Sequence, residues 1–211
     1  LGKAWTTEKG CNILMSLIIK PAPLPISAQP GFNFAVSCGL HEFFARYAGT
    51  DTRIKWPNDL YWQDRKAGGV LIESIVGSPK SGGREQASSQ LVWDWAVVGI
   101  GININQTVFD PALPNPVSLK QITGRHFDPK ELAFELADAV KRSVARLKAG
   151  QAEAIHEQYL SCLYKRNEKV RLKKGPRVFE ALIRSVSADG RLVATTAIDE
   201  YFENGSVEWL R

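Results

Sequence analysis

The stretch from Arg53 to Ile75 constrains the fold most strongly, because three strand-like pieces follow one another there with only short polar turns between them. The pieces are rich in aromatic and β-branched residues and comprise Arg53–Trp56, Leu60–Trp62 and Val70–Ile75. The last two are joined by the polar turn Gln63-Asp64-Arg65-Lys66. This pattern predicts a β-hairpin.

Two long apolar runs predict further strands. Cys11–Lys20 alternates little between apolar and polar residues, so we expect a strand that is buried on both faces and ended by Pro21. The apolar run Val92–Ile104 predicts a second buried strand. Between the hairpin and this strand, Gly77–Gln90 is rich in glycine and serine, which predicts a surface loop.

Two stretches have apolar residues at helical spacing. The first, which ends near Gly49, carries Leu40, Phe43, Phe44 and Tyr47. The second begins with Asp128 as an N-cap, has Pro129 and Glu131 in its first turn, and runs to Gly150. Both patterns predict helices with one face on the core.

The character of the sequence changes after Tyr164, where short β-rich pieces alternate with glycine and aspartate turns. These pieces are Lys169–Leu172, Val178–Val186, Arg191–Thr196 and Val207–Leu210. They predict a small, barrel-like β module. The module also carries a basic run, made of Lys165, Arg166, Lys169, Arg171, Lys173, Lys174 and Arg177. A charged strand surface explains this run better than a nucleic-acid interface, because no aromatic residues are interleaved for base stacking.

Bulk composition favours a soluble protein of a reducing compartment. The 211 residues, 44% hydrophobic and 23% charged, suffice for one enzyme-sized domain and a small second one. No apolar run approaches the roughly 20 residues of a membrane span, and no secretory signal is recognisable. Cys11, Cys38 and Cys162 are far apart, so we expect buried thiols in a reducing cytoplasm. The net charge of +5 favours acidic partners without choosing among them.

Residues able to do chemistry are concentrated in Lys55-Trp56-Pro57-Asn58-Asp59 and in the following Lys66-Ala67-Gly68-Gly69. The proline forces the residue before it out of helical geometry, and the hairpin returns Lys66 toward Asp59. An ammonium and a carboxylate then lie on one rim. The paired glycines let a backbone or a ligand approach where a side chain would block it, which predicts a small-molecule cleft.

Three segments together resemble the signature of biotin protein ligases. They are Lys55-Trp56-Pro57-Asn58-Asp59 with Lys66-Ala67-Gly68-Gly69-Val70-Leu71-Ile72-Glu73, then Gly99-Ile100-Gly101-Ile102-Asn103-Ile104-Asn105, and Gly2-Lys3-Ala4-Trp5 running into Gly10-Cys11-Asn12-Ile13. Three motifs in order are far more specific than one. The resemblance implies an α+β fold like that of class II synthetases, with a mixed sheet and flanking helices in residues 1–163. It also implies an SH3-like β-barrel in residues 164–211.

The resemblance implies an activity as well. Enzymes of this family use ATP and Mg²⁺ to convert biotin to biotinyl-AMP, and then transfer it to a lysine of a biotin carboxyl carrier protein, as in acetyl-CoA carboxylase. By position, Lys66 matches the lysine that contacts the biotin carboxylate and the α-phosphate. Asp59 matches the aspartate that orients or deprotonates the incoming amine. An ammonium at this place offsets the repulsion between carboxylate and phosphate.

Other residues match binding positions of the family. On the biotin and adenylate side these are Gly68, Gly69, Trp5, Trp56 and Asn58, and on the nucleotide side Lys3, Asn103 and Arg211. For Asn103 a strand-ending role is equally open, and for Asn105 it is the better interpretation. No protein-bound metal is expected, since magnesium arrives with ATP and the histidines lack metal-like spacing.

The family's Arg-Gly-Arg loop would begin upstream of Leu1, so we expect the chain to be an N-terminally incomplete part of a longer protein. Lys3 stands where many relatives have arginine, which loses bidentate phosphate geometry. Relatives often pair through the catalytic sheet, which makes a homodimer possible. Two alternatives stay open: a lipoate or octanoate ligase or transferase on the same core, and a non-catalytic nucleic-acid-binding module.

Overall fold

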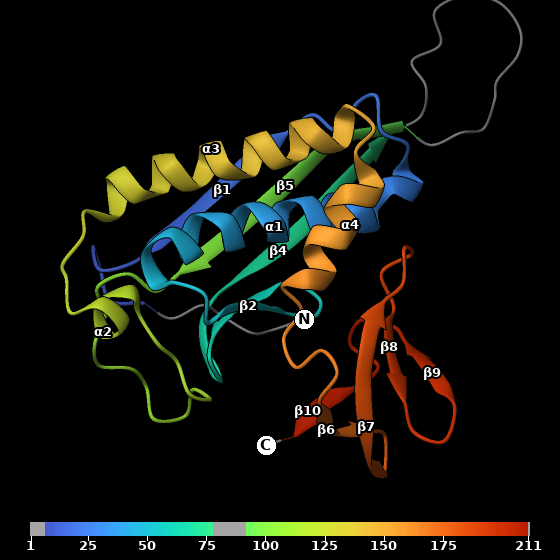
Figure 1. Cartoon of the computed structure of the whole chain (residues 1–211). Coiled ribbons are helices and arrows are strands. Elements are labelled where there is room, and N and C mark those ends of the chain that lie inside the picture. Colours follow the sequence, from blue (N-terminus) through green and yellow to red (C-terminus); the bar gives the residue numbers. More distant parts are fainter. Residues whose placement is uncertain (1–6, 78–91, 211) are drawn as a thin grey trace, which may run out of the picture.

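The structure is a computed structural model that describes residues 7–77 and 92–210, and these form two β-sheets and a layer of helices (Figure 1). The first sheet has the order β1-β5-β4-β3-β2, with β1 (Ile13–Ile19), β2 (Thr52–Lys55), β3 (Asp59–Trp62), β4 (Arg65–Gly77) and β5 (Val92–Ile102). The predicted hairpin is the β3–β4 pair. Lys3, Trp5, Arg211 and most of the predicted loop Gly77–Gln90 lie outside the described residues.

The α+β class is confirmed, but the expectation of a mixed sheet is wrong. All four neighbouring strand pairs of the first sheet are antiparallel. For two of these pairs the reason is the short connections: three residues join β2 to β3 and two join β3 to β4. Chain segments this short can link only antiparallel neighbours, because a parallel pair needs a crossover of a dozen or more residues.

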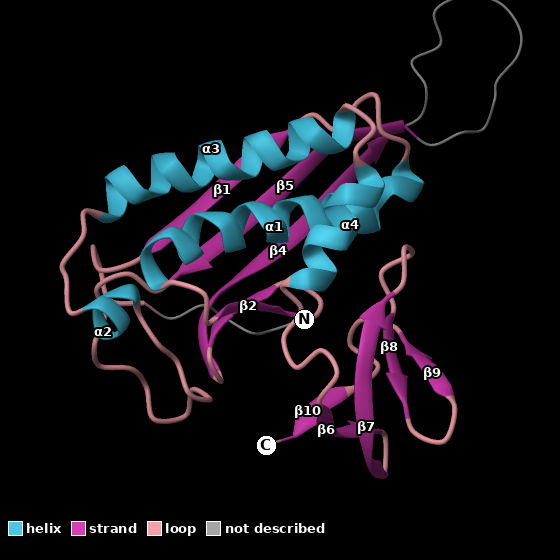
Figure 2. Ribbon diagram, viewed as in Figure 1, coloured by secondary structure: helices cyan, strands magenta, loops and turns pink. Residues whose placement is uncertain are grey.

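Helices cover one face of this sheet (Figure 2). They are α1 (Gln29–Ala48), α3 (Pro129–Lys148) and α4 (Ala152–Ser161), with the short α2 (Leu119–Thr123) at one end and a 3₁₀ turn at Ile26–Ala28. The N-terminus of α3 is as predicted, since the Asp128 carboxylate accepts hydrogen bonds from the backbone N–H groups of Lys130 and Glu131. The predicted first helix starts earlier than its apolar pattern, at Gln29.

Strand β1 corrects the expectation of a strand buried on both faces. Ile13 is buried and Met15 and Leu17 pack against the core, whereas Leu14 and Ile18 are exposed. The helices lie on only one face of the sheet in the described part of the chain, so every second residue of β1 faces away from them. An apolar composition alone did not reveal this one-sided cover.

The cysteines are free thiols, but only one is fully buried. Cys38 lies inside the core on α1, whereas Cys11 and Cys162 are half-buried. The expectation of buried thiols therefore holds for Cys38 and is wrong for the other two. Both lie just outside regular elements, before β1 and after α4, where packing is less complete.

The C-terminal residues form a second antiparallel sheet with the order β10-β6-β7-β8-β9. Its strands are β6 (Lys169–Lys174), β7 (Arg177–Val186), β8 (Leu192–Thr195), β9 (Asp199–Phe202) and β10 (Glu208–Leu210). The sheet is open, with β10 and β9 at its edges, and Leu172, Ile183 and Phe202 are buried in it. Four strands match the predicted pieces, and β9 was not foreseen.

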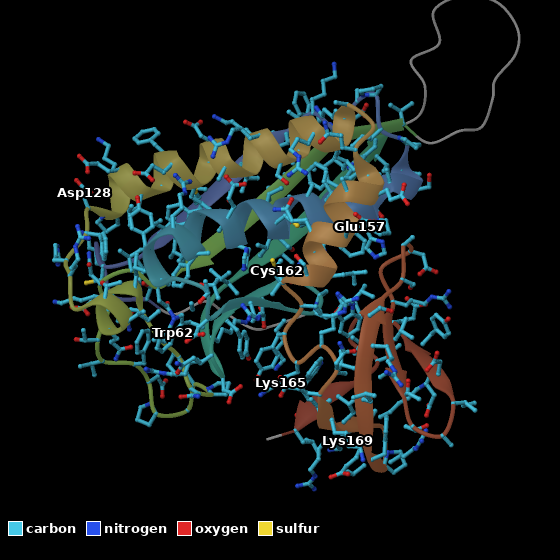
Figure 3. The ribbon with its side chains drawn as sticks, viewed as in Figure 1. Trp62, Asp128, Glu157, Cys162, Lys165 and Lys169 are labelled. Atoms are coloured by element: carbon cyan, nitrogen blue, oxygen red, sulfur yellow. The ribbon has the colours of Figure 1, made fainter. Side chains whose placement is uncertain are left out.

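The connection between α4 and β6 runs along strand β2 of the first sheet. Ile54 of β2 donates its backbone N–H to the Cys162 carbonyl and accepts from the Tyr164 N–H, both at 2.8 Å. Figure 3 shows Cys162 and Lys165 on this connection, between the helical layer and the second sheet. In the described residues, no helix is long and apolar enough to cross a membrane.

Candidate active site

The side chains of Asp59 and Lys66 form an ion pair across the β3–β4 hairpin. Lys66 Nζ lies 2.6 Å from Asp59 Oδ1, and each side chain is about one third exposed, 32% and 31%. The strands bring them together because a two-residue turn joins β3 to β4 and Lys66 pairs with Tyr61. The predicted convergence of an ammonium and a carboxylate is therefore present, at a place that a ligand can reach.

Gly69 lies against this pair, and Gly68 serves a different purpose. A Cβ at Gly69 would come within 2.8 Å of Asp59 Oδ1 and 3.5 Å of Lys66 Nζ, so the missing side chain makes room for the ion pair. A Cβ at Gly68 would meet the Gly101 carbonyl at 2.7 Å. Gly68 thus allows β4 and β5 to approach each other, and in this structure it is backbone, not a ligand, that occupies the space.

The chain around Lys66 is held on its second side by the segment that precedes α2. The Lys66 N–H donates to the Asn115 carbonyl at 3.0 Å, and its carbonyl accepts from the Val117 N–H at 2.9 Å. The Arg65 guanidinium donates to the Pro116 carbonyl. The backbone of Lys66 is therefore held by β3 on one side and by this segment on the other.

Asn103 and Asn105 both have protein partners. The Asn103 N–H donates to the Ala67 carbonyl, and its buried side-chain amide donates to the Val117 carbonyl at 3.1 Å. The Asn105 amide forms hydrogen bonds with both backbone groups of Phe127, at 2.7 and 3.1 Å. Asn103 therefore joins the strand of Lys66 to the segment beside it, and the contacts of Asn105 agree with a structural role.

Trp56 and Asn58 also contact protein. The Trp56 ring is buried, and its indole N–H donates to the Gly190 carbonyl, in the turn between β7 and β8 of the second sheet, at 2.9 Å. The Asn58 amide donates to Asn33 of α1 at 3.0 Å. The structure therefore brings Asp59, Lys66 and Gly69 together, with Asn103 beside them. Trp56 and Asn58 instead contact Gly190 and Asn33.

The β3–β4 turn, which precedes Lys66, makes polar contacts with the connection between α4 and β6. The Asp64 carboxylate accepts from the Tyr164 hydroxyl at 2.7 Å and lies 3.2 Å from Lys165 Nζ. The hydrogen bond from Tyr164 is the main cause that lowers the pKa of Asp64, and Lys165 adds to it. This carboxylate is thus tied up in supporting the hairpin.

The basic run of the second sheet is largely offset by acidic neighbours. Arg171 lies opposite Glu180, and Lys173 lies opposite Glu208. Arg177 forms two hydrogen bonds with Glu200, at 3.0 and 3.1 Å. Cross-strand pairs of this kind place opposite charges side by side, so the run does not present an unbroken positive surface.

No metal centre is present among residues 7–77 and 92–210. No group of three or more His, Cys, Asp or Glu side chains there is arranged to hold a metal ion. A cavity of about 390 Å³ lies between the start of β1 and the start of α3, lined by residues that include Asn12, Asp128 and Lys130. Its lining carries neither Asp59 nor Lys66.

Known proteins are similar to this chain in sequence and in fold. The profile described as "Biotin/lipoate A/B protein ligase family" matches residues 1–84. The chain is 26% identical over 198 residues to a "Biotin--[acetyl-CoA-carboxylase] ligase" of Paracoccus denitrificans, covering 91% of this chain and 77% of that protein. It is 27% identical over 198 residues to the "Bifunctional ligase/repressor BirA" of Escherichia coli K12, covering 91% of this chain but only 56% of the relative.

A solved structure agrees. The biotin protein ligase of Aquifex aeolicus in complex with biotin and ATP superposes with a TM-score of 0.77 at 21% sequence identity, covering 100% of this chain and 82% of the other. At this identity the likeness concerns the fold. Together with the profile match and the two relatives, it leads to one conclusion: in sequence and in fold, this chain is similar to biotin protein ligases.

Proposed function

We propose that this protein activates biotin with ATP to form biotinyl-AMP and then transfers biotin to a lysine of a carrier protein. The observation that carries the proposal is the Asp59–Lys66 ion pair, 2.6 Å long and set against Gly69, within the segment that matches the family profile. The names of the Paracoccus and Escherichia coli relatives point to the same reaction.

In the first step, a carboxylate oxygen of biotin attacks the α-phosphorus of ATP, and the bond from that phosphorus to the pyrophosphate oxygen breaks. Both reactants are anionic, so the step needs positive charge at the point of approach. Lys66 supplies it: its ammonium is only partly exposed, and its backbone is fixed on both sides. Magnesium would enter with ATP as part of the substrate.

In the second step, the carrier lysine attacks the biotinyl carbonyl carbon, and the bond from that carbon to the AMP oxygen breaks. The amine must lose a proton as the amide forms. Asp59 is the carboxylate beside Lys66 that can accept it, since its second oxygen, Oδ2, is not the one paired with Lys66 at 2.6 Å. One ion pair thus provides for both steps.

Further parts of the proposal follow the family. The catalytic domain spans residues 1–163, and residues 164–211 form an SH3-like domain. Lys3, Trp5 and Arg211 contact the adenylate, and Asn103 reaches the nucleotide through its side-chain oxygen or its second amide N–H, because one amide N–H already donates to the Val117 carbonyl. The carrier is a biotin carboxyl carrier protein of a carboxylase such as acetyl-CoA carboxylase. The protein works in the cytoplasm and can pair as a homodimer.

Pyrophosphate release by the purified full-length protein tests the proposal. Biotin with magnesium-ATP should release pyrophosphate and leave biotinyl-AMP, and adding a carrier domain should attach biotin to its lysine, as seen by mass spectrometry. Lipoate and octanoate serve as the matched acids. Release that depends on lipoate or octanoate and not on biotin would replace the proposal by the sibling ligase activity.

A further inference from the structure

The three residues before Asp59 form the loop of the β2–β3 hairpin. Lys55 and Asp59 are paired across the hairpin, and Trp56, Pro57 and Asn58 connect them. Any shift of this loop moves the start of β3, where Asp59 lies. The position of the Asp59 carboxylate against Lys66 therefore depends on what holds residues 56–58.

A single side chain of α1 grips two of these residues. The Asn33 amide nitrogen donates to the Pro57 carbonyl at 3.1 Å, and its side-chain oxygen accepts from the Asn58 amide at 3.0 Å. Both polar ends of the Asn33 amide are thus used on adjacent residues of the loop. A two-point contact of this kind fixes orientation as well as distance, whereas one hydrogen bond allows rotation.

Two more contacts complete the support of the loop. The hydroxyl of Tyr159, a fully buried residue of α4, donates to the same Pro57 carbonyl at 2.9 Å. Burial raises the pKa of Tyr159, so its hydroxyl keeps the proton that it donates. The Trp56 indole is held by Gly190 on the far side. The loop is therefore anchored to α1, to α4 and to the second sheet.

The place of Asn33 on α1 is not explained by packing in the core. It is only half-buried, unlike its neighbours Phe32 and Phe34, so filling space does not explain it. Its polar contacts are to the loop, and the loop leads directly into the ion pair.

We propose that Asn33 is a positioning residue, which acts through Asn58 and Pro57 to set the Asp59 carboxylate against Lys66. This inference rests on the proposed function, since it assigns Asn33 a part in the same two steps. Displacing a reacting group by about 1 Å can cost about 100-fold in rate, so a side chain that touches no substrate can still control the reaction.

Crystal structures and kinetics of matched variants test this inference. Asn33→Ala removes both contacts, Asn33→Asp keeps the acceptor for Asn58 but loses the donor to Pro57, and Tyr159→Phe removes only the second donor. Tyr47→Phe is the control, because Tyr47 lies on the same helix and loses one hydroxyl bond, to Glu135, away from the loop.

The expected kinetic result is a drop of about 10- to 100-fold in kcat for biotin transfer in Asn33→Ala, with the KM for biotin within about 2-fold of wild type. In an Asp59→Ala background the same substitution should cost no more than about 2-fold, because its effect passes through Asp59. A purely structural role would instead add fully to the effect of Asp59→Ala. Full additivity, or wild-type kcat in Asn33→Ala, overturns the inference.

The crystal structure of Asn33→Ala gives a test that needs no activity. The Asp59–Lys66 ion pair should open in this variant and stay closed in Tyr47→Phe, and an unchanged pair in the variant overturns the inference. If Asn33→Ala does not fold, Asn33→Asp and Tyr159→Phe take its place in both measurements. A wild-type protein without biotin-dependent pyrophosphate release refutes the proposed function, while the structures still decide whether Asn33 positions Asp59.

Discussion

Gly69 lies so close to Asp59 that a Cβ at position 69 would come within 2.8 Å of the Asp59 carboxylate oxygen, and within 3.5 Å of Lys66 Nζ. The 2.6 Å ion pair between Asp59 and Lys66 therefore depends on the lack of a side chain at position 69 of β4. Since the same three residues lie in the segment that matches the family profile, this arrangement is the centre of the account.

Substitution Gly69→Ala should open the ion pair and lower the rate of biotin-dependent pyrophosphate release by about 10-fold or more, because the methyl group displaces the Asp59 carboxylate and with it the Lys66 ammonium that this carboxylate holds. Pyrophosphate release and a crystal structure measure the two effects. Gly99→Ala is the structural control, since the nearest atoms to its Cβ would lie at 3.7 and 3.9 Å, an ordinary contact. An intact pair and a wild-type rate in Gly69→Ala would contradict the account.

Substitution Asn105→Ala should lower the free energy of unfolding by about 2–4 kcal/mol, because it leaves the buried N–H and C=O groups of Phe127 without partners. Urea denaturation measures this loss. The exposed Asn204→Ala is the control, with an expected change of about 0.5 kcal/mol or less. A normal stability combined with a raised KM for ATP would show instead that Asn105 binds the nucleotide.

Substitution Trp56→Phe should leave the KM for biotin within about 2-fold of wild type, since the buried ring faces Gly190 and not an open cleft. The lost indole hydrogen bond should weaken docking of the second sheet by about 1 kcal/mol. Limited proteolysis of the connection between α4 and β6 detects this weakening. A strong rise in the KM for biotin, with proteolysis unchanged, would show instead that Trp56 binds biotin, as its motif predicts.

Stability should fall on mild acidification in a way that depends on His41. Burial lowers the pKa of His41 below its ordinary 6.5, and its ring hydrogen-bonds with the Thr52 carbonyl at 3.1 Å. The folded state thus favours the neutral ring, so the stability gained from it is complete above the unfolded-state pKa and is lost as pH falls through the folded one. Thermal melting at about pH 7.5 and about pH 5.5 should show a larger loss for wild type than for His41→Gln. Equal losses would refute the shift.

The sequence predicted the elements whose signals are local. The Asp128 cap and the apolar face of α3 lie within one segment, and so do the turn and strands that bring Lys66 back to Asp59. Because side-chain direction follows from strand register, the convergence of these two residues could be inferred before any coordinates. Helix α4 and strand β9 were missed, since both are short and polar on much of their surface.

Contacts between distant parts of the chain could not be predicted. Asn33 and Asn58 are 25 residues apart, and Tyr159 and Pro57 are 102 apart, so no local pattern marks them. For Gly68 the sequence left a backbone and a ligand as equal possibilities, and only the register of β4 against β5 shows that the Gly101 carbonyl approaches it. The expectation of a mixed sheet came from the resemblance and was wrong. The short β2–β3 and β3–β4 connections alone would have predicted antiparallel neighbours.

The most direct measurement compares Lys66→Met with Lys165→Met in biotin-dependent pyrophosphate release. Both lysines are in ion pairs and similarly exposed, with side-chain exposures of 32% and 29%, but Lys165 lies on the connection between α4 and β6 and pairs with Glu168 there and with Asp64 of the β3–β4 turn. The account predicts a loss of about 100- to 1,000-fold for Lys66→Met, because the charge between biotin and the α-phosphate is gone, and a rate near wild type for Lys165→Met. Equal rates in the two variants would contradict it.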